Sequence, residues 1–540
     1  MIFSASRWRG CRGLTAWPVF SVALVVALVL GCSQLALAHV GSPDVYVDGN
    51  AGPYRLFVTI RPPLVIPGVA EIEVRVEPGT SGATVSSIQI APIPLTGEAS
   101  LHPPVADAMK QSAADKQFFT GALWIMASGS WQVRFTVNGN QGGGVLSIPV
   151  PAMSSSTRGM QASLGVLLSG LGLVLVVGVV GIVGAAVRDA QLPPGAPVQP
   201  ARRKGAWIAM SIAVALIGGA IWFGASWWQS EADNYAKKVY KPLTMQATLT
   251  PDNTLKLKIN DPGWLKSRTL DDFVLDHDHL MHLYLIREPG LDLVYHLHPD
   301  QVAPGTFQLA MPSMPAGSYE VYADVVHATG FPETLVSRIT LPKITGRPLA
   351  GDDAEGIAPA LSSLRPAPGM AACPVTPPAG AQFHLQDGYS MVWNNATKDP
   401  ARTPELFSFT LLDPAGKPPA DMALYMGMVG HAAFVKDDGT VFAHVHPSGT
   451  ASMTALMMAA SQNQQQPPAP ARKDSVKPDA MSAMPGMAMT QSSASQTPNT
   501  VGFPYGFPTA GAYRIFVQMK HGQTIETAAF DACATPSRLN

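Results

Sequence analysis

The stretch Met281-His-Leu-Tyr-Leu-Ile begins a histidine pattern that occurs twice in this chain. A His-x-His-Pro motif, an Ala-Gly-x-Tyr motif and a final His follow it, and the same series recurs from Gly430. Eight of the 13 His in the 540 residues fall on the two copies: His282, His296, His298, His327, His431, His444, His446 and His521. Because histidine is the side chain that most commonly binds metals, the repeat predicts two related modules that each hold a metal.

The spacing within each copy indicates how four rings would meet. Side chains at positions i and i+2 of a strand point to the same face, so the two His of each His-x-His motif project together. His282 begins one strand and His327 ends another, and such ends meet at one edge of an antiparallel sandwich. We therefore predict the sites His282/His296/His298/His327 and His431/His444/His446/His521. The alternative is that these His bond to the backbone at the rim and are structural.

Two further histidines, His277 and His279, precede the first copy. They either enlarge the first metal site or belong to a solvated polar loop.

Methionines favour copper among the metals that imidazole binds, since imidazole suits zinc, copper and nickel and thioether sulfur selects Cu(I). Met428 lies close to His431, and four more methionines lie in a polar segment without a core to fill: Met481, Met484, Met487 and Met489. Their spacing resembles the Met-rich loops of periplasmic copper-resistance proteins. Copper is the predicted metal, with zinc as the alternative.

Short alternating segments predict a mostly β protein. Tyr54-Arg-Leu-Phe-Val-Thr-Ile and Trp131-Gln-Val-Arg-Phe-Thr-Val alternate with the period of a strand, and similar segments occur in both His modules. We expect three immunoglobulin-like or cupredoxin-like β-sandwich domains and a two-helix transmembrane hairpin. The predicted domains are a first sandwich (39–158), module 1 (240–345), a linker (346–372) and module 2 (373–540), in which residues of about 450–500 form a Met-rich disordered insertion.

The N-terminal segment reads as a signal peptide of residues 1–38. Arginines precede an apolar run that ends at Ala36-Leu-Ala, which is typical of a cleaved secretory signal. Cleavage would leave His39 at the N-terminus, whose amine and ring would then be able to chelate Cu(II). A lipoprotein signal that ends at Cys32 is the alternative.

Two uncharged runs predict transmembrane helices at 160–187 and 206–230, because each exceeds the ~20 residues needed to cross a bilayer. The connecting loop, 188–205, holds one acid and four basic residues: Arg188, Arg202, Arg203 and Lys204. The positive-inside rule places this loop in the cytoplasm. The soluble domains would then lie in the periplasm of a bacterial inner-membrane protein.

The cysteines Cys373 and Cys533 bracket module 2. Outside the cytoplasm they are expected to form a disulfide; two buried thiols are the alternative.

Several classes of function lack support. The net charge of −1 gives no electrostatic reason to expect nucleic acid. The sequence contains no nucleophile elbow, His-Glu-x-x-His motif or phosphate loop, so we do not expect an enzyme. A blue-copper site needs a Cys ligand beside two His, and the module cysteines are predicted to pair.

Both modules resemble YtkA-like periplasmic β-sandwich domains. The resemblance rests on Met428-Val-Gly-His, on Phe442-Ala-His-Val-His-Pro and on Ala510-Gly-Ala-Tyr-Arg-Ile-Phe-Val-Gln; module 1 is a looser version. The first sandwich resembles FixH- or CopC-like proteins in its strand pattern. The resemblance implies the fold and a role in metal handling.

The sequence thus predicts a membrane-anchored periplasmic protein that binds copper and buffers it or passes it to another periplasmic or membrane metalloprotein. The alternative function is an envelope interaction scaffold whose His residues are structural.

Overall fold

The alternating segments form strands where they were expected, and the fold is mostly β with two long apolar helices. The computed structural model describes residues 43–77, 82–157, 159–190, 192–193, 195–266, 268–361, 378–395, 400–465 and 497–537. The predicted signal peptide, His39, Cys32, Cys373 and the four methionines of 481–489 lie outside the described residues.

Two antiparallel sheets, β1-β2-β3-β7-β6 and β5-β4-β8-β9, make the first sandwich. Its inward-facing apolar side chains, such as Val58, Ile72 and Phe135, form one core. The strands are β1 (Val45–Ala51), β2 (Tyr54–Arg61), β3 (Gly68–Val76), β4 (Val85–Pro94), β5 (Asp107–Ala108), β6 (Lys110–Gln111), β7 (Phe118–Ile125), β8 (Gly129–Gly139) and β9 (Gly142–Ala152), and the 3-10 helix η1 covers Glu98–Leu101.

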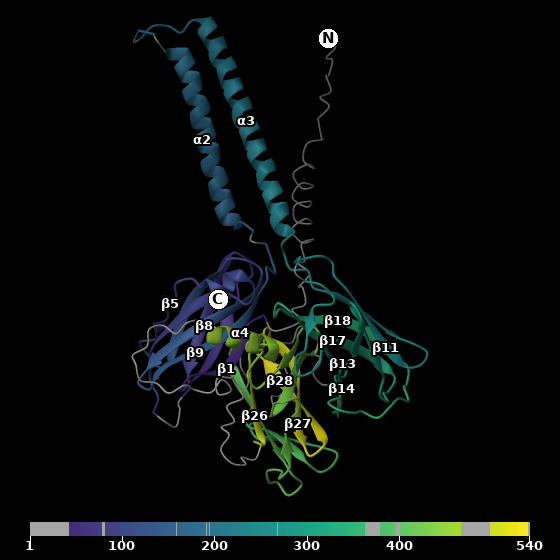
Figure 1. Ribbon diagram of the computed structural model, residues 1–540. Coiled ribbons are helices and arrows are strands. Elements are labelled where there is room, and N and C mark those ends of the chain that lie inside the picture. The colour runs from purple at the N-terminus through teal and green to yellow at the C-terminus, as the bar shows by residue number, and fades with distance from the viewer. Residues whose placement is uncertain are drawn as a thin grey trace, which may run out of the picture. The chain divides into compact units, whose positions relative to one another are not determined.

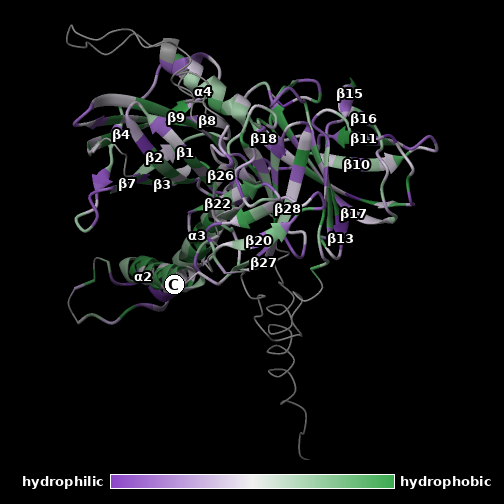
Figure 2. Cartoon of the chain, turned by 90° about the horizontal axis from the view of Figure 1, so that it is seen from below, coloured by the Kyte–Doolittle hydropathy of each residue, from purple (hydrophilic) through white to green (hydrophobic). Residues whose placement is uncertain are grey.

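Two helices follow, α2 (Ala162–Asp189) and α3 (Pro200–Ala236), which run side by side (Figure 1). Both are long and apolar enough to cross a membrane, and Figure 2 shows α2 as hydrophobic along most of its length. Their large side chains are exposed in the structure; Leu216 and Trp222 are 70% and 72% exposed. These helices therefore indicate that the protein is anchored in a membrane.

Module 1 pairs a smaller sheet, β10-β11-β16-β15, with a larger one, β12-β17-β13-β14-β19, to which β18 adds beside β17. The strands are β10 (Thr244–Leu249), β11 (Thr254–Asn260), β12 (Phe273–Val274), β13 (His282–Glu288), β14 (Leu293–Leu297), β15 (Asp300–Ala303), β16 (Thr306–Ala310), β17 (Gly317–His327), β18 (Pro332–Leu341) and β19 (Ala354–Ile357). Strand β19 comes from the predicted linker.

Module 2 repeats this plan with the sheets β20-β21-β22-β26 and β23-β27-β24-β25, and β28 adds beside β27. The strands are β20 (Ala381–His384), β21 (Ser390–Trp393), β22 (Glu405–Leu412), β23 (Met422–Ala423), β24 (Gly430–Lys436), β25 (Phe442–Val445), β26 (Thr500–Tyr505), β27 (Gly511–His521) and β28 (Thr524–Ala534). Strands β24, β25 and β27 thus correspond to β13, β14 and β17 of module 1.

The larger sheets of the two modules pack face to face. Strands β13, β14 and β24 are buried along nearly their whole length, because one face contacts its own module's core and the other contacts the partner module. Tyr322 stacks on Phe442 across this junction, with ring centroids 4.2 Å apart and planes 7° from parallel. We call this second apolar core, which also contains Tyr284, Val435 and Phe516, the inter-module core.

The predicted disordered insertion begins with a helix, α4 (Met453–Gln465). The prediction for these residues was wrong because apolar side chains of α4 have a partner that the sequence did not reveal. Ala455 and Ala459 pack against Leu95 of the first sandwich, and Ser147 of that sandwich donates to Asn463 at 2.9 Å. Residues 466–496 lie outside the described part of the chain.

The first sandwich and the two modules belong to one compact unit, Val40–Asn540. In addition to α4, an ion pair joins Asp44 to Arg402 at 3.1 Å, and Tyr46 is part of the core of module 2.

Candidate metal centre

Eight imidazole rings meet where the two modules pack together. Neighbouring ring centroids lie between 3.8 Å, for the stacked pair His279 and His298, and about 6 Å. We call this set the eight-histidine cluster: His277, His279, His282, His296, His298, His431, His444 and His446. The sequence predicted two separate sites, whereas the structure joins three His of each predicted site in one cluster.

One group of three, which we call the module 1 triad, is His282, His296 and His298, whose ligand atoms lie within 4.8 Å of one another. His282 Nδ1 lies 3.2 Å from His296 Nε2. Two nitrogens bound to one tetrahedral ion at about 2.0–2.1 Å are about 3.3 Å apart. This pair is therefore already spaced as two ligands of a single ion.

The second group, the inter-module triad, combines His277 of module 1 with His431 and His446 of module 2, again within 4.8 Å. His277 reaches module 2 from a tight turn in which Asp276 and His279 exchange backbone hydrogen bonds of 2.8 and 3.1 Å. His277 and Asp278 have φ values of 50° and 67°, the left-handed region that the two central residues of such a turn occupy.

Outer hydrogen bonds hold most of these rings through one nitrogen. Within module 1, His282 Nε2 lies 3.0 Å from the carbonyl oxygen of Asp276, and His298 Nδ1 lies 3.2 Å from Asp353. In module 2, His446 Nδ1 lies 3.4 Å from the carbonyl oxygen of Ala451. Rings that bind a metal usually donate their other N–H to a carboxylate or a carbonyl in this way.

The two modules also hold each other's histidines. Gln518 on β27 accepts from His296 Nδ1 at 2.9 Å, and Asp324 at the corresponding position of β17 lies 3.4 Å from His444 Nδ1. The registers agree, because Asp324 is paired with His282 and Gln518 with His431. Common descent of the modules therefore explains why the supports are exchanged across the junction.

Several ring nitrogens of the cluster lack partners. Among the described residues, no hydrogen-bond partner exists for Nε2 of His277, His298, His431, His444 and His446 or for Nδ1 of His431. Each buried polar atom without a partner calls for an explanation, such as a missing ion or water. A convergence of this many imidazole nitrogens fits a metal centre, since each offers a lone pair to an ion.

Burial keeps six of the rings neutral. Desolvation, with smaller contributions from neighbouring His, lowers the pKa of His282, His298 and His446 to about 3, and it also lowers the pKa of His296, His431 and His444. Neutral imidazole is the form that binds metals. Burial also raises the pKa of Asp324 to about 7.

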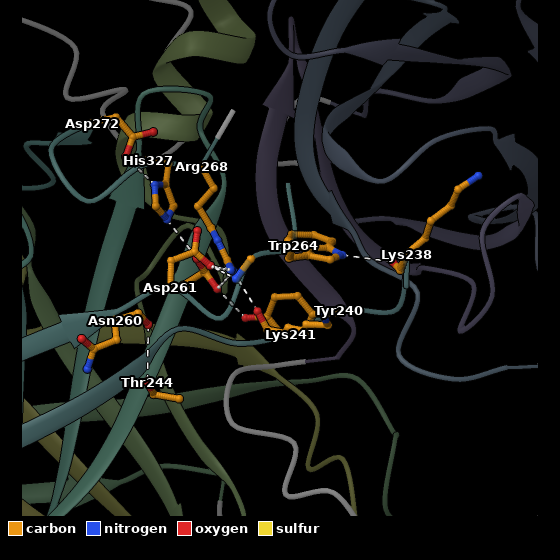
Figure 3. A network of polar contacts seen from close by, with 12 residues as sticks. Lys238, Tyr240, Lys241, Thr244, Asn260, Asp261, Trp264, Arg268, Asp272 and His327 are labelled. Atoms are coloured by element: carbon orange, nitrogen blue, oxygen red, sulfur yellow. Dashed lines mark hydrogen bonds and ion pairs between the residues drawn. The ribbon is translucent and has the colours of Figure 1, made fainter. Parts of the chain in front are cut away.

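His327, the fourth residue of the first predicted site, lies in a different network (Figure 3). Its Nδ1 is 2.6 Å from Asp272 and its Nε2 is 2.9 Å from Glu333, which also pairs with Arg268 at 2.9 Å. Tyr240, just beyond α3, donates to Glu333 at 2.7 Å. Both nitrogens of His327 are thus engaged with acids, and the structure does not bring it into the eight-histidine cluster.

His521, its counterpart in module 2, is also apart from the cluster. It is stacked on Tyr389, with centroids 4.1 Å apart, and lies close to three acids, with Nε2 3.2 Å from Glu526. With Asp387 and Glu526 it forms a third group of potential ligands. Burial and the neighbouring Asp387 raise the pKa of Glu526 to about 7.

Two predicted residues with sulfur-containing side chains, Met428 and Cys533, lie in the described part of the chain. Met428 is buried and closes a turn with Tyr425, whose hydroxyl lies 3.2 Å from His296 Nδ1. Cys533 is 1% exposed, but Cys373 lies outside the described residues, so the disulfide stays a prediction.

Sequence reasoning left His277 and His279 undecided and did not find Asp353 or Gln518 as supports. The His-x-His spacing of 277–279 was the available signal, since it repeats the motif of both modules. Gln518 and Asp353 carry no such signal, because their roles depend on contacts between segments far apart in the sequence.

No family model matches the chain, and no curated protein matches it. Solved structures with a distant likeness to this chain include a tetra-tandem repeat from the extending region of a large adhesion protein, with 9% identity, 87% of this chain and 71% of that chain covered and a TM-score of 0.15. Domains A168–A170 of titin (8% identity, 92% and 98% covered, TM-score 0.13) and a putative membrane-anchored protein from Corynebacterium diphtheriae (9%, 92% and 96%, TM-score 0.12) are others. Likeness at this level carries no argument about function.

Proposed function

We propose that this membrane-anchored protein binds copper in the eight-histidine cluster, on the periplasmic side of a bacterial inner membrane. The observation that carries the proposal is that the two nitrogens of a single imidazole ring differ in their hydrogen-bond partners. In His298, His444 and His446, Nδ1 lies close to a carboxylate or carbonyl oxygen of the surrounding protein, while Nε2 has no partner among the described residues. His282 and His296 place their remaining nitrogens 3.2 Å from each other. A purely structural histidine would satisfy both nitrogens, as His327 does with its two acids.

The donor set favours copper over other metals. The inward-facing atoms are imidazole nitrogens, which suit late transition metals, and Cu²⁺ forms the most stable complexes of the divalent first-row series. Zinc is the second candidate because it takes the same ligands. The predicted role is to buffer copper or deliver it to another envelope metalloprotein; the resemblance to YtkA-like domains agrees with such a role.

A titration of the full chain in detergent tests the proposal. The protein is stripped with a chelator and titrated with Cu(I), Cu(II) or Zn(II) against a competing chelator of known affinity. We expect stoichiometric binding, tightest for copper, and a rise in unfolding free energy of about 2.7 kcal/mol when free metal exceeds Kd 100-fold.

The matched variants are Gln518→Ala and Gln382→Ala. Gln518 orients His296, and loss of such an outer hydrogen bond typically weakens metal binding about 10–100-fold; Gln382 is an exposed glutamine of the same module and should leave affinity unchanged. Stability that is indifferent to metal, with Gln518→Ala affecting folding alone, would favour the structural scaffold.

A further inference from the structure

We propose that the eight-histidine cluster is a two-ion centre, with one ion in the module 1 triad and the other in the inter-module triad. This inference rests on the proposed metal binding and adds its stoichiometry and its dependence on both modules.

The two triads have separate, complete ligand sets. Each contributes three nitrogens within 4.8 Å of one another, and they share no residue. Three histidine ligands and an open position are a common arrangement for a bound metal. An ion in the module 1 triad alone would leave Nε2 of His277, Nε2 of His446 and both nitrogens of His431 buried without partners among the described residues. An ion in the inter-module triad alone would leave Nε2 of His298 in the same state, so a single-ion centre does not explain the unsatisfied atoms in both triads.

His444 lies between the triads. Its ring centroid is 5.3 Å from His282 and 5.5 Å from His296, and also 5.4 Å from His431 and 4.6 Å from His446. Its Nε2 has no partner among the described residues, while Asp324 holds its Nδ1. His444 is therefore placed to complete the coordination of either ion, which makes the two sites neighbours in one centre.

The inter-module triad exists only where the modules meet. Module 2 supplies His431 and His446 from the start of β24 and the end of β25, and module 1 supplies His277 from the turn of 276–279. That turn is fixed by a third part of the chain, because the backbone N–H of Thr454 in α4 donates to Asp276 at 2.8 Å. An ion bound here would tie module 1 to module 2.

The corresponding turn of module 2 shows that the centre is asymmetric. Tyr425 and Met428 form the same type of turn, with φ values of 50° at Met426 and 76° at Gly427. Met426 occupies the place of His277 and packs with Ala354 of the module 1 sheet. Since the turn of module 2 carries no imidazole, the inter-module triad draws its third histidine, His277, from module 1.

Metal counting on the full chain tests this inference. Wild type is expected to hold two equivalents of copper, with His277→Asn and His298→Gln each losing one. Asn suits the left-handed backbone of His277, which limits any effect on folding. His384→Asn removes an exposed histidine outside the cluster and should retain two equivalents.

The other outcomes are distinct. One equivalent in wild type would overturn the two-ion centre and leave the proposed function intact, whereas no tight binding would overturn both. Two equivalents retained in His277→Asn would overturn the inter-module assignment. If His298→Gln fails to fold, anomalous scattering from copper-loaded wild-type crystals decides the number directly: two separate peaks support the inference and one peak overturns it.

Discussion

Two side chains at corresponding strand positions give His444 and His296 different surroundings. Asp324 supports His444, and Gln518 supports His296 from the corresponding strand position. An ionised carboxylate beside an imidazole raises the basicity of the ring more than a neutral amide does. Burial raises the pKa of Asp324 to about 7, so this difference grows as the pH rises above that value. The duplicated modules thus keep the geometry of the support and change its charge.

His327 gives a prediction about pH. Burial alone would lower its pKa, but hydrogen bonds to Glu333 and Asp272 outweigh that effect and raise the pKa above 6.5. A raised folded-state pKa stabilises the protein fully below the unfolded value of about 6.5, and this stability is lost as pH rises through the folded value. We expect His327→Gln to lower the unfolding free energy by about 1–3 kcal/mol at pH 6 and by less at pH 9.

Urea unfolding of the metal-free protein across this range measures the difference between wild type and variant. His102→Gln, at an exposed histidine of the first sandwich, is the control for a general effect of removing a titratable ring. A difference that grows with pH, or that does not change, would contradict the role assigned to the two acids.

At the scale of elements, the sequence predicted where the strands lie, but not which parts of the chain pack against them. The His-x-His pairs lie at the ends of β14 and β25, as the spacing indicated. The apolar run Ala432–Val435 in β24 is typical of a strand with both faces buried, but it does not say what covers the second face. Because that cover is the other module, two predicted rim sites became one buried centre.

Two smaller errors have the same origin. The sequence favoured a solvated loop for the turn of 276–279, since the contacts of this turn are with His431 and His446, far along the chain. The helix α4 was predicted as disorder because its apolar side chains pack on the first sandwich. In each case a tertiary contact, which the local sequence pattern does not reveal, overturned the expected loop.

The inter-module core allows the junction to be tested separately from the modules. Phe442 is fully buried there against Tyr284 and Tyr322, and Phe442→Ala should cost about 3–5 kcal/mol. Because the inter-module triad depends on the junction, copper affinity at that triad should fall, while the module 1 triad should retain its ion.

Phe409→Ala is the matched control for this prediction. Phe409 is equally buried but lies in module 2's own core, so Phe409→Ala should lower the free energy of unfolding by a similar amount. At temperatures where this variant is folded, neither triad should lose as much copper affinity as the inter-module triad loses in Phe442→Ala. Equal losses of copper from the two variants would mean that the junction has no special role.

For the whole molecule, the order of the elements and the contacts between the sandwiches both indicate that the three sandwiches share one side of the membrane. The first sandwich precedes α2, and both modules follow α3. Two crossings return the chain to the side from which it started, so all three sandwiches would lie on one side of the membrane. The ion pair of Asp44 with Arg402 and the packing of α4 on the first sandwich require this.

The loop between α2 and α3 predicts the direction of insertion. Its basic residues, among them Arg202 and Arg203, predict a cytoplasmic location. An epitope inserted after Pro197 should survive proteinase treatment of spheroplasts, whereas a C-terminal epitope should be lost. Disrupting the membrane should expose the loop epitope, which controls for intrinsic resistance. Digestion of the loop epitope in intact spheroplasts, with the C-terminal epitope protected, would place the eight-histidine cluster in the cytoplasm and remove the case for an envelope partner.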